Sequence, residues 1–305
     1  MSGTTTTTSL NFPVPTKPTP TKYNLVSPRG AKLVTRVWPP KKKPKALCLF
    51  VHGGGWHSGY FEALASHLNK TSDIFCAAYD QAGCGYSEVE PTTPDPNYMH
   101  FDDFDCLVED VYEAMEWMVK EAGTTNDDDY VPVYIFGESF GGPQVLEAAF
   151  QQADRKDGVR IAGVIVFGGL IRINPAMVPP PFVCNIVAFL AKYYPKIKMP
   201  STDFESTFDE AFGDKEWAKT ARADPKITTN PKGTLAAISA TLSSGRALLE
   251  KAQDFPVPLL CVHGREDCRT LLEGIQEFCD KAGPSKATLH VVETTGHQLL
   301  QDTPE

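Results

Sequence analysis

The feature of this sequence that most restricts its fold is a series of short runs made almost entirely of apolar residues. Five runs recur along the 305-residue chain: Ala46–Val51, Ile74–Tyr79, Val131–Phe136, Ile161–Phe167 and Leu259–His263. They do not alternate apolar with polar residues, and such continuous runs are typical of parallel strands covered on both faces. The runs therefore predict a parallel sheet that is buried between layers of helices.

Helical patterns fill the segments between these runs. In the clearest one, apolar residues recur at three- and four-residue steps on one face between Phe104 and Val119. Strand and helix patterns thus alternate along the chain. This alternation predicts the α/β class, with a mostly parallel central sheet and helices on both of its faces.

The alternation stops between about residues 170 and 255. Proline clusters at Pro175 and Pro179–Pro181, and an acidic stretch from Asp203 to Asp214, replace the strand rhythm there. We predict a core in two parts, residues 23–169 and 256–305, with residues 170–255 inserted between them as a cap. Residues 1–22 are rich in threonine and proline and are expected to form a disordered tail.

Within the predicted cap, Phe182–Tyr194 is expected to form a helix that is apolar nearly all round, with Asn185 and Lys192 as its strongly polar members. Two interpretations stay open. A helix that is apolar on all sides usually packs on a core. The other interpretation is a lid that faces lipid, admits an acyl chain and brings the cap into peripheral contact with a membrane.

Charge and cysteine content restrict the class of partner and the compartment. The chain has 29 basic and 38 acidic residues and a net charge of −9, which opposes binding to the nucleic-acid backbone. Neither a signal peptide nor an apolar stretch of about 18 residues is present, so we expect a soluble protein. The eight cysteines lack metal-ligand spacing, and this pattern without a secretory signal predicts a cytoplasmic location.

The segment Gly137-Glu138-Ser139-Phe140-Gly141 carries the first candidate for chemistry. It follows the apolar run that ends at Phe136 and precedes a helical pattern at Gln144–Gln152. A serine at such a sharp turn is held exposed, and small residues two positions away on each side leave room for the strained backbone. The turn also places the N–H of Phe140 at a helix N-terminus, where it can meet a developing oxyanion. The pattern alone occurs in many plain turns, but this setting favours Ser139 as a nucleophile.

A run of glycines supplies a second candidate. His52-Gly53-Gly54-Gly55 directly follows the apolar run Ala46–Val51. A glycine run in a loop is more often only a turn. Where a nucleophile elbow is also present, however, such a loop donates the second N–H to the oxyanion. We therefore predict an oxyanion hole made by the N–H groups of Gly54 and Phe140.

Ser139 needs a base, because an unassisted hydroxyl is a poor nucleophile at neutral pH. Asp267 follows the apolar run Leu259–His263, and His297 follows a further apolar stretch at Leu289–Val292. Loops after strands are where a parallel sheet places catalytic groups. The chain order Ser139, Asp267, His297 is the order of nucleophile, acid and base in α/β hydrolases. Glu266 stays open as an alternative acid, although aspartate is the more usual one.

Other groups fit structural roles better. Asp127–Asp129 lacks the spacing of a calcium-binding loop and is expected to form a solvated turn. The remaining histidines lie at strand ends, on helix surfaces, in loops or within a strand: His52, His57, His67, His100, His263 and His290.

At these residues the sequence resembles the monoacylglycerol lipase family of α/β hydrolases, especially its plant-type branch of monoacylglycerol lipases, lysophospholipases and caffeoylshikimate esterases. The resemblance runs from about Tyr23 to the C-terminus. Its most specific marks are HGGGWHSGY at 52–60, DQAGCGYS at 80–87 and GESFGG at 137–142.

The resemblance implies an α/β-hydrolase fold and hydrolysis of a carboxylic ester, with no metal or organic cofactor. The expected reaction converts a monoacylglycerol to glycerol and a fatty acid through an acyl-enzyme, with the cap forming the acyl pocket. Carried over by position, the catalytic residues are Ser139, Asp267 and His297, and the oxyanion donors are Gly54 and Phe140.

The sequence departs from the family at three places. Cys84 stands where the family commonly has histidine, Phe140 replaces a methionine, and the sequence ends at Glu305, where the family usually continues into a closing helix. The alternatives are a lysophospholipase or another carboxylesterase, and a non-catalytic binding protein on the same fold. The last is disfavoured because every expected catalytic position is occupied.

Overall fold

The computed structural model describes residues 15, 24–124, 131–155, 158–200, 205, 207–294 and 296–301. The turn predicted at Asp127–Asp129 lies outside the described residues. So does the tail predicted at residues 1–22, apart from Pro15.

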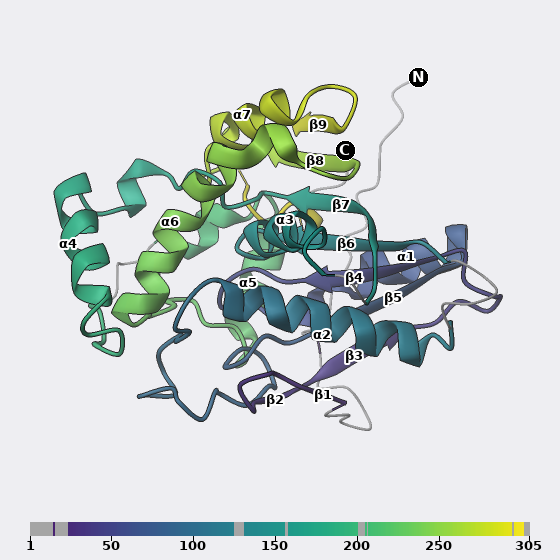
Figure 1. Ribbon diagram of the computed structural model, residues 1–305, viewed down its shortest axis with the longest axis horizontal. Helices are drawn as coiled ribbons and strands as arrows, with labels where there is room; N and C mark the ends of the chain where they lie inside the picture. Colours follow the sequence, from purple (N-terminus) through teal and green to yellow (C-terminus); the bar gives the residue numbers. More distant parts are fainter. Residues whose placement is uncertain are drawn as a thin grey trace, which may run out of the picture.

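A seven-stranded sheet forms the centre of the molecule (Figure 1). Its strands are, in spatial order, β3 (Thr35–Trp38), β5 (Ile74–Tyr79), β4 (Ala46–Val51), β6 (Val133–Glu138), β7 (Ile161–Phe167), β8 (Leu259–Gly264) and β9 (Ala287–Val292). Strand β3 runs antiparallel to β5, and the other neighbouring pairs are parallel. A separate antiparallel pair joins β1 (Leu25–Val26) to β2 (Lys32–Leu33). This arrangement confirms the predicted α/β class.

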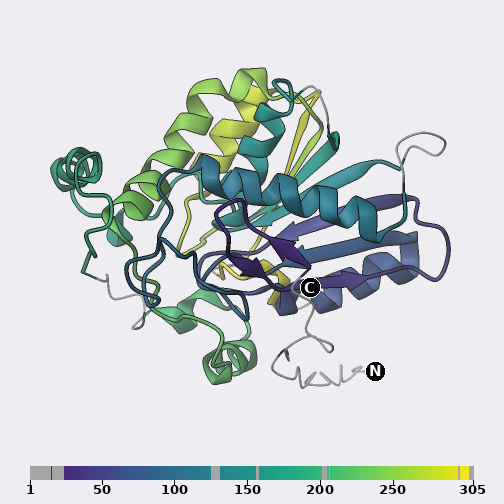
Figure 2. The same ribbon diagram turned by 60° about the horizontal axis from the view of Figure 1, so that its bottom comes forward.

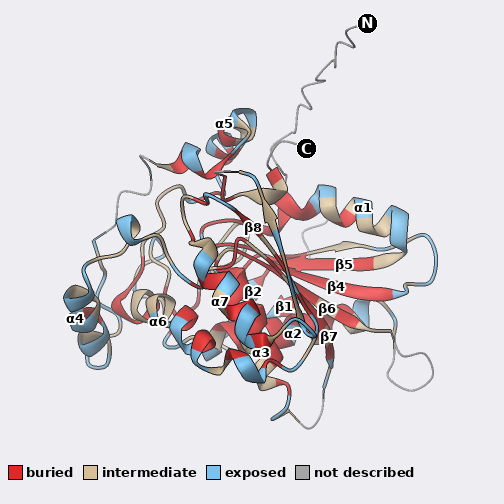
Figure 3. Ribbon diagram, turned by 90° about the horizontal axis from the view of Figure 1, so that it is seen from above, coloured by how far each residue is buried: buried red, intermediate tan, exposed pale blue. Residues whose placement is uncertain are grey.

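Helices cover both faces of the sheet. On one face, α2 (Asp105–Glu121), α3 (Gly141–Gln151) and α7 (Leu272–Ala282) pack on the larger apolar cluster, and on the other α1 (Glu62–Ser72) packs on a smaller, aromatic one. Figure 2 shows α2 and α1 on opposite sides of the strands. In β4, Leu47 and Leu49 join the first cluster while Cys48 and Phe50 join the second. The central strands are therefore buried on both faces (Figure 3), which is why they read as continuous apolar runs.

Between β7 and β8 the chain leaves the sheet, and we call residues 170–255 the β7–β8 segment. It contains η2 (Pro175–Met177), α4 (Pro181–Ala191), η3 (Phe208–Ala211), α5 (Lys215–Ala223), α6 (Leu235–Lys251) and η4 (Ala252–Asp254). Leu248 and Leu249 of α6 belong to the larger core cluster, so this helix anchors the segment to the sheet layer. Figures 1 and 2 show α4 beyond α6 at the periphery of the molecule.

Helix α4 forms where an apolar helix was predicted, and it packs on α6 rather than on the sheet core. Val187 is its buried residue. Phe182, Ile186 and Phe189 are exposed, and their spacing of four and three residues places them on one face. The exposed ring of Tyr193, two residues beyond the helix, lies 5.3 Å from that of Phe189. The helix is therefore covered by α6 on one side and exposed on the other, and its contact with lipid stays a prediction. Within the described part of the chain, no helix combines the length and apolar character needed to cross a membrane.

Candidate active site

Ser139 occupies the sharp turn between β6 and α3, with a positive φ of 51°. L-residues rarely adopt this conformation, and it is held here by the surrounding structure. A Cβ on Gly137 would lie 2.4 Å from the carbonyl oxygen of Gly141, and one on Gly141 would lie 2.2 Å from that of Val51. Glycine is therefore required on both sides of the serine, which explains the spacing seen in the sequence.

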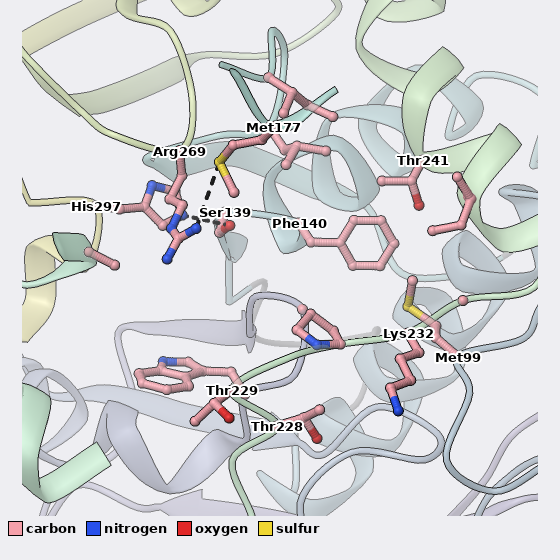
Figure 4. A pocket seen from close by; sticks show the side chains of 18 of the residues that line it. Met99, Ser139, Phe140, Met177, Thr228, Thr229, Lys232, Thr241, Arg269 and His297 are labelled. Atoms are coloured by element: carbon pink, nitrogen blue, oxygen red, sulfur yellow. Dashed lines mark hydrogen bonds between the residues drawn. The ribbon is translucent and has the colours of Figure 1, made fainter. Parts of the chain in front are cut away.

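The structure brings Ser139, His297 and Asp267 together from three separate loops. The Nδ1–H of His297 donates to Asp267 Oδ2 at 2.7 Å, because an ionised carboxylate can only accept. Nε2 is then free to accept from the hydroxyl of Ser139, 2.8 Å away. Figure 4 shows this contact at one end of a cavity. The pairing leaves the histidine in the tautomer that can remove a proton from the serine.

Asp267 is held rigidly in the loop after β8. Its Oδ1 accepts from the backbone N–H groups of Arg269 at 2.7 Å and Thr270 at 3.0 Å. Burial raises the pKa of Asp267, but the charge and hydrogen bond of His297 and these two N–H groups outweigh burial and hold the pKa below its ordinary value. The alternative acid, Glu266, is exposed to solvent. The structure thus places Asp267, and not Glu266, against the histidine.

Two neighbours of Asp267 were missed by the sequence analysis. Thr270 Oγ1 lies 3.0 Å from Asp267 Oδ2 and 3.1 Å from Nε2 of His263, which is fully buried. The other ring nitrogen of His263 donates to the carbonyl of Gly264 at 2.8 Å. Burial lowers the pKa of His263, which keeps it neutral beside the acid. These contacts fix the carboxylate from a second side.

The two predicted oxyanion donors lie next to each other. A methyl group built on Gly54 would lie 3.8 Å from Cβ of Phe140, and Phe140 is the residue that caps α3. Neither backbone N–H donates to an oxygen atom in the part of the chain described. Two unpaired N–H groups beside Ser139 form a suitable cradle for negative charge.

The loop that carries Gly54 is braced by His52, whose ring is fully buried. Its Nδ1–H donates to the carbonyl of Gly53 at 2.7 Å, and its Nε2 accepts from the N–H of Gln81 at 2.9 Å. Burial lowers the pKa of His52 to about 4, so the ring is neutral at physiological pH. His52 thus has the structural role expected for it.

A second buried contact ties the same loop to the β7–β8 segment. His57 precedes the 3-10 helix η1 (Ser58–Phe61), and its Nε2–H donates to Asp224 Oδ2 at 2.9 Å. The hydroxyl of Tyr60 donates to the same oxygen at 3.2 Å, and the N–H of Lys226 donates to Oδ1 at 2.8 Å. The position of the β7–β8 segment is therefore coupled to that of the glycine loop.

Cys84, the departure from the family pattern between two glycines, lies against the glycine loop. The nearby backbone N–H of Gly55 acts to lower the pKa of its thiol. Burial nevertheless raises the pKa of Cys84 to about 12, so the thiol stays protonated at neutral pH. A protonated thiol is a weak nucleophile, and Cys84 packs as a small apolar side chain.

Ser139 and His297 open into a cavity of about 270 Å³. Most of the side chains around it are apolar; two cations, Lys232 and Arg269, contribute, and no aspartate or glutamate is among the described residues that line it. Helix α4 itself contributes no residue to this lining, whereas Met177 and Met199, on either side of that helix in the chain, do. Helix α4 therefore does not line the cavity, and its part in admitting an acyl chain stays a prediction.

The wall opposite the nucleophile comes mainly from the β7–β8 segment. Figure 4 shows Phe140, Thr241 and Met99 toward one side of the cavity and Ser139 and His297 toward the other. The side chain of Arg269 donates to Oγ1 of Thr207 at 2.9 Å and so connects the loop of the acid to this wall.

Comparison with known proteins agrees with this architecture. The profile of the family described as serine aminopeptidase, S33, matches residues 42–304. This chain belongs to that family. Within the S33 family it is 26% identical to the monoglyceride lipase of Homo sapiens over 92% of this chain and 85% of the relative.

Solved structures share the fold of this S33 family member. A soluble variant of monoglyceride lipase from Saccharomyces cerevisiae, in complex with a substrate analog, superposes with a TM-score of 0.72 at 22% identity. That match covers 96% of this chain and 91% of the other. The monoacylglycerol lipase of Paleococcus ferrophilus gives 0.68 at 19% identity, covering 88% and 92%. The predicted α/β-hydrolase fold and the resemblance to monoacylglycerol lipases are confirmed; the plant-type branch stays a prediction.

Proposed function

We propose that this protein is a serine hydrolase that cleaves carboxylic esters, with monoacylglycerols as its substrate class. The observation that carries the proposal is the chain of contacts from Asp267 through His297 to Ser139, which opens into an apolar cavity. The relatives named monoglyceride lipase and monoacylglycerol lipase support the substrate class. In this proposal residues 170–255 act as a cap over the cavity.

Acylation begins when Ser139 Oγ attacks the ester carbonyl carbon while His297 Nε2 takes its proton. The carbonyl oxygen becomes an oxyanion between the N–H groups of Gly54 and Phe140, and Asp267 stabilises the imidazolium. The intermediate then breaks its bond to the alcohol oxygen. His297 gives its proton to that oxygen, so glycerol leaves and the acyl group stays on Ser139.

Deacylation repeats the sequence with water. His297 removes a proton from a water molecule as its oxygen attacks the acyl carbon, and the same two N–H groups hold the second oxyanion. The proton returns to Ser139 Oγ as its bond to the acyl group breaks. Fatty acid leaves and the enzyme is restored.

The lining of the cavity favours an ester over a peptide with a free amino terminus. An aminopeptidase must bind an ammonium group, and a buried ammonium requires a negative partner. The charged residues that line the cavity, Lys232 and Arg269, are both cationic. The apolar side chains around them instead suit a fatty acyl chain.

The test is the release of fatty acid and glycerol from a long-chain monoacylglycerol by the purified protein. Ser139→Ala serves as the matched variant, and an amino-acid anilide and a lysophospholipid as competing substrates. The proposal predicts that the wild type alone hydrolyses the monoacylglycerol and prefers it to both competitors. Equal release by Ser139→Ala would refute the nucleophile, and faster cleavage of the anilide or the lysophospholipid would refute the substrate class.

The exposed face of α4 fits peripheral contact with the lipid that holds such a substrate. It presents Phe182, Ile186 and Phe189, with the exposed Tyr193 beside Phe189 just beyond the helix, and fully burying one large apolar side chain contributes about 1.5–3 kcal/mol. The chain segments on both sides of α4 line the cavity, so a membrane at this face would lie near its wall. The cytoplasmic location predicted from the cysteines stays a prediction.

Cosedimentation with phosphatidylcholine vesicles tests this contact. Replacing both Phe182 and Phe189 with aspartate is expected to abolish binding and to slow hydrolysis of vesicle-borne substrate more than that of a soluble acetate ester. Val26→Asp is the control, because Val26 is also exposed but belongs to β1. Equal binding by the double variant and the control would rule out docking through α4.

A further inference from the structure

The carboxyl group of Glu138 is buried beside the nucleophile without any hydrogen bond in the described residues. This residue directly precedes Ser139 and is only 2% exposed. Both of its oxygen atoms are buried without a hydrogen-bond partner among the described residues. An unpaired buried carboxylate costs stability, and such costs are concentrated at functional sites.

Strand β6 places Glu138 on the face of the sheet that the histidine loop covers. Side chains alternate along a strand, so Glu138 shares the face of Phe136. The ring of Phe136 lies 4.9 Å from that of Phe167, and Leu300 packs on the same aromatic cluster. Leu300 belongs to η5 (Leu299–Gln301), which begins two residues after His297.

His297 is the ionisable group whose charge acts on Glu138. Apolar side chains from β4, β5, β7, α1 and η1 make up the rest of the aromatic cluster on this face. Burial raises the pKa of Glu138 to about 7, while the charge of His297 acts to lower it. A positive charge on His297 therefore favours the ionised form of Glu138.

We propose that Glu138 is a positioning residue for the reaction, whose buried carboxylate stabilises the imidazolium that forms when His297 takes the proton of Ser139. This inference rests on the proposed function. Asp267 supports the imidazolium through Nδ1, and Glu138 adds a second negative charge from the sheet beneath the nucleophile. Glu138 transfers no proton and touches no substrate.

The linkage gives the proposal a distinct dependence on pH. The carboxyl of Glu138 loses its proton as the pH rises through and above about 7, so its support of the imidazolium increases over that range. Glutamine has the same length but no charge, so it mimics the protonated form. Glu138→Gln is therefore expected to match the wild type at about pH 6 and to fall behind it, by a factor on the order of ten, at about pH 9.

Thermal stability distinguishes this role from a structural one. Removing an unpaired buried charge relieves its desolvation, so Glu138→Gln and the apolar Glu138→Met are expected to melt at or above the wild-type temperature when the pH is above about 7. A residue kept for the fold would instead lower the melting temperature in both variants. Glu138→Met also keeps the test available if the glutamine variant fails to fold.

The experiment measures turnover of a soluble acetate ester across this pH range for the wild type, both Glu138 variants and Glu266→Gln. The exposed carboxylate of Glu266 also lies near the site, and its removal is expected to leave the ratio to wild type flat. A variant-to-wild-type ratio that falls as the pH rises, only for the Glu138 variants and without loss of stability, supports the proposal. A flat ratio, or lower melting temperatures, overturns it. If the wild type shows no ester hydrolysis that requires Ser139, the proposed function is wrong, and this inference falls with it.

Discussion

Replacing Asp267 with asparagine changes one contact of the proposed catalytic site and leaves its scaffold in place. In the wild type, Oδ1 accepts from two backbone N–H groups and Oδ2 accepts from His297. The amide oxygen of asparagine can still accept from the backbone, so its NH₂ group is directed at Nδ1 of the histidine. We expect the fold to persist and the hydrogen bond to His297 to reverse its direction.

The reversal determines the size of the effect. With Nδ1 accepting, the ring proton moves to Nε2, which then cannot accept a proton from Ser139 2.8 Å away. The same change in another serine hydrolase lowers turnover by about 10⁴. This corresponds to about 5.4 kcal/mol of activation free energy. Thr270→Val removes only the hydroxyl's hydrogen bond to the same ionised carboxylate, worth about 1.5–3 kcal/mol, and is expected to cost at most about a hundredfold.

Initial rates with a soluble p-nitrophenyl ester measure both variants, and circular dichroism checks that each is folded. Glu266→Gln, one residue away and exposed, is the matched control and is expected to behave as the wild type. A folded Asp267→Asn protein within about tenfold of wild-type turnover would refute the tautomer argument. A large loss in Glu266→Gln instead would show that the acid was wrongly assigned.

Three further predictions concern the scaffold. Gly137→Ala places a methyl group 2.4 Å from a backbone oxygen, so calorimetry should show a lower melting temperature together with loss of activity; an unchanged protein would contradict the elbow geometry. Burial raises the pKa of Asp224, but its bonds to His57 and neighbouring groups outweigh burial and hold it below the ordinary value. Asp224→Asn should therefore lose about 3–5 kcal/mol in urea unfolding at neutral pH, with the difference shrinking as the pH falls below about 4, and equal stability at neutral pH would argue against the tether. Phe278 is a fully buried ring whose centre lies 5.5 Å from that of Phe255. Phe278→Ala should lower the free energy of unfolding by about 3–5 kcal/mol in the same urea measurement. A loss under about 1 kcal/mol would contradict this packing, because it would mean that neighbouring side chains fill the cavity.

The apolar runs predicted the central strands well, because a strand that is buried on both faces has apolar residues at nearly every position. Strands β4, β5 and β7 have the bounds of their runs. Strand β6 continues two residues further, through Gly137 and Glu138, because both pair with neighbouring strands although neither is apolar. Edge strand β3 went unpredicted, since Arg36 and the partly exposed side chains beside it give no such run.

The candidate site was predictable where a local motif fixes geometry, and not where burial or distant pairing decides. Asp267 and Glu266 are adjacent in sequence, and only the structure separates the buried one from the exposed one. The partner of His57 lies 167 residues away, so sequence spacing carries no signal for it. The same holds for Glu138, because the lack of a hydrogen-bond partner for its buried carboxyl group is a result of tertiary packing.

The most direct test of the account is to trap the nucleophile with a fluorophosphonate carrying a long alkyl chain and to map the adduct by mass spectrometry. The account predicts one adduct per chain, on the peptide that contains Ser139, with no labelling of Ser139→Ala and slow labelling of His297→Ala. An adduct on another residue, or ester hydrolysis that persists in Ser139→Ala, would contradict the proposed mechanism.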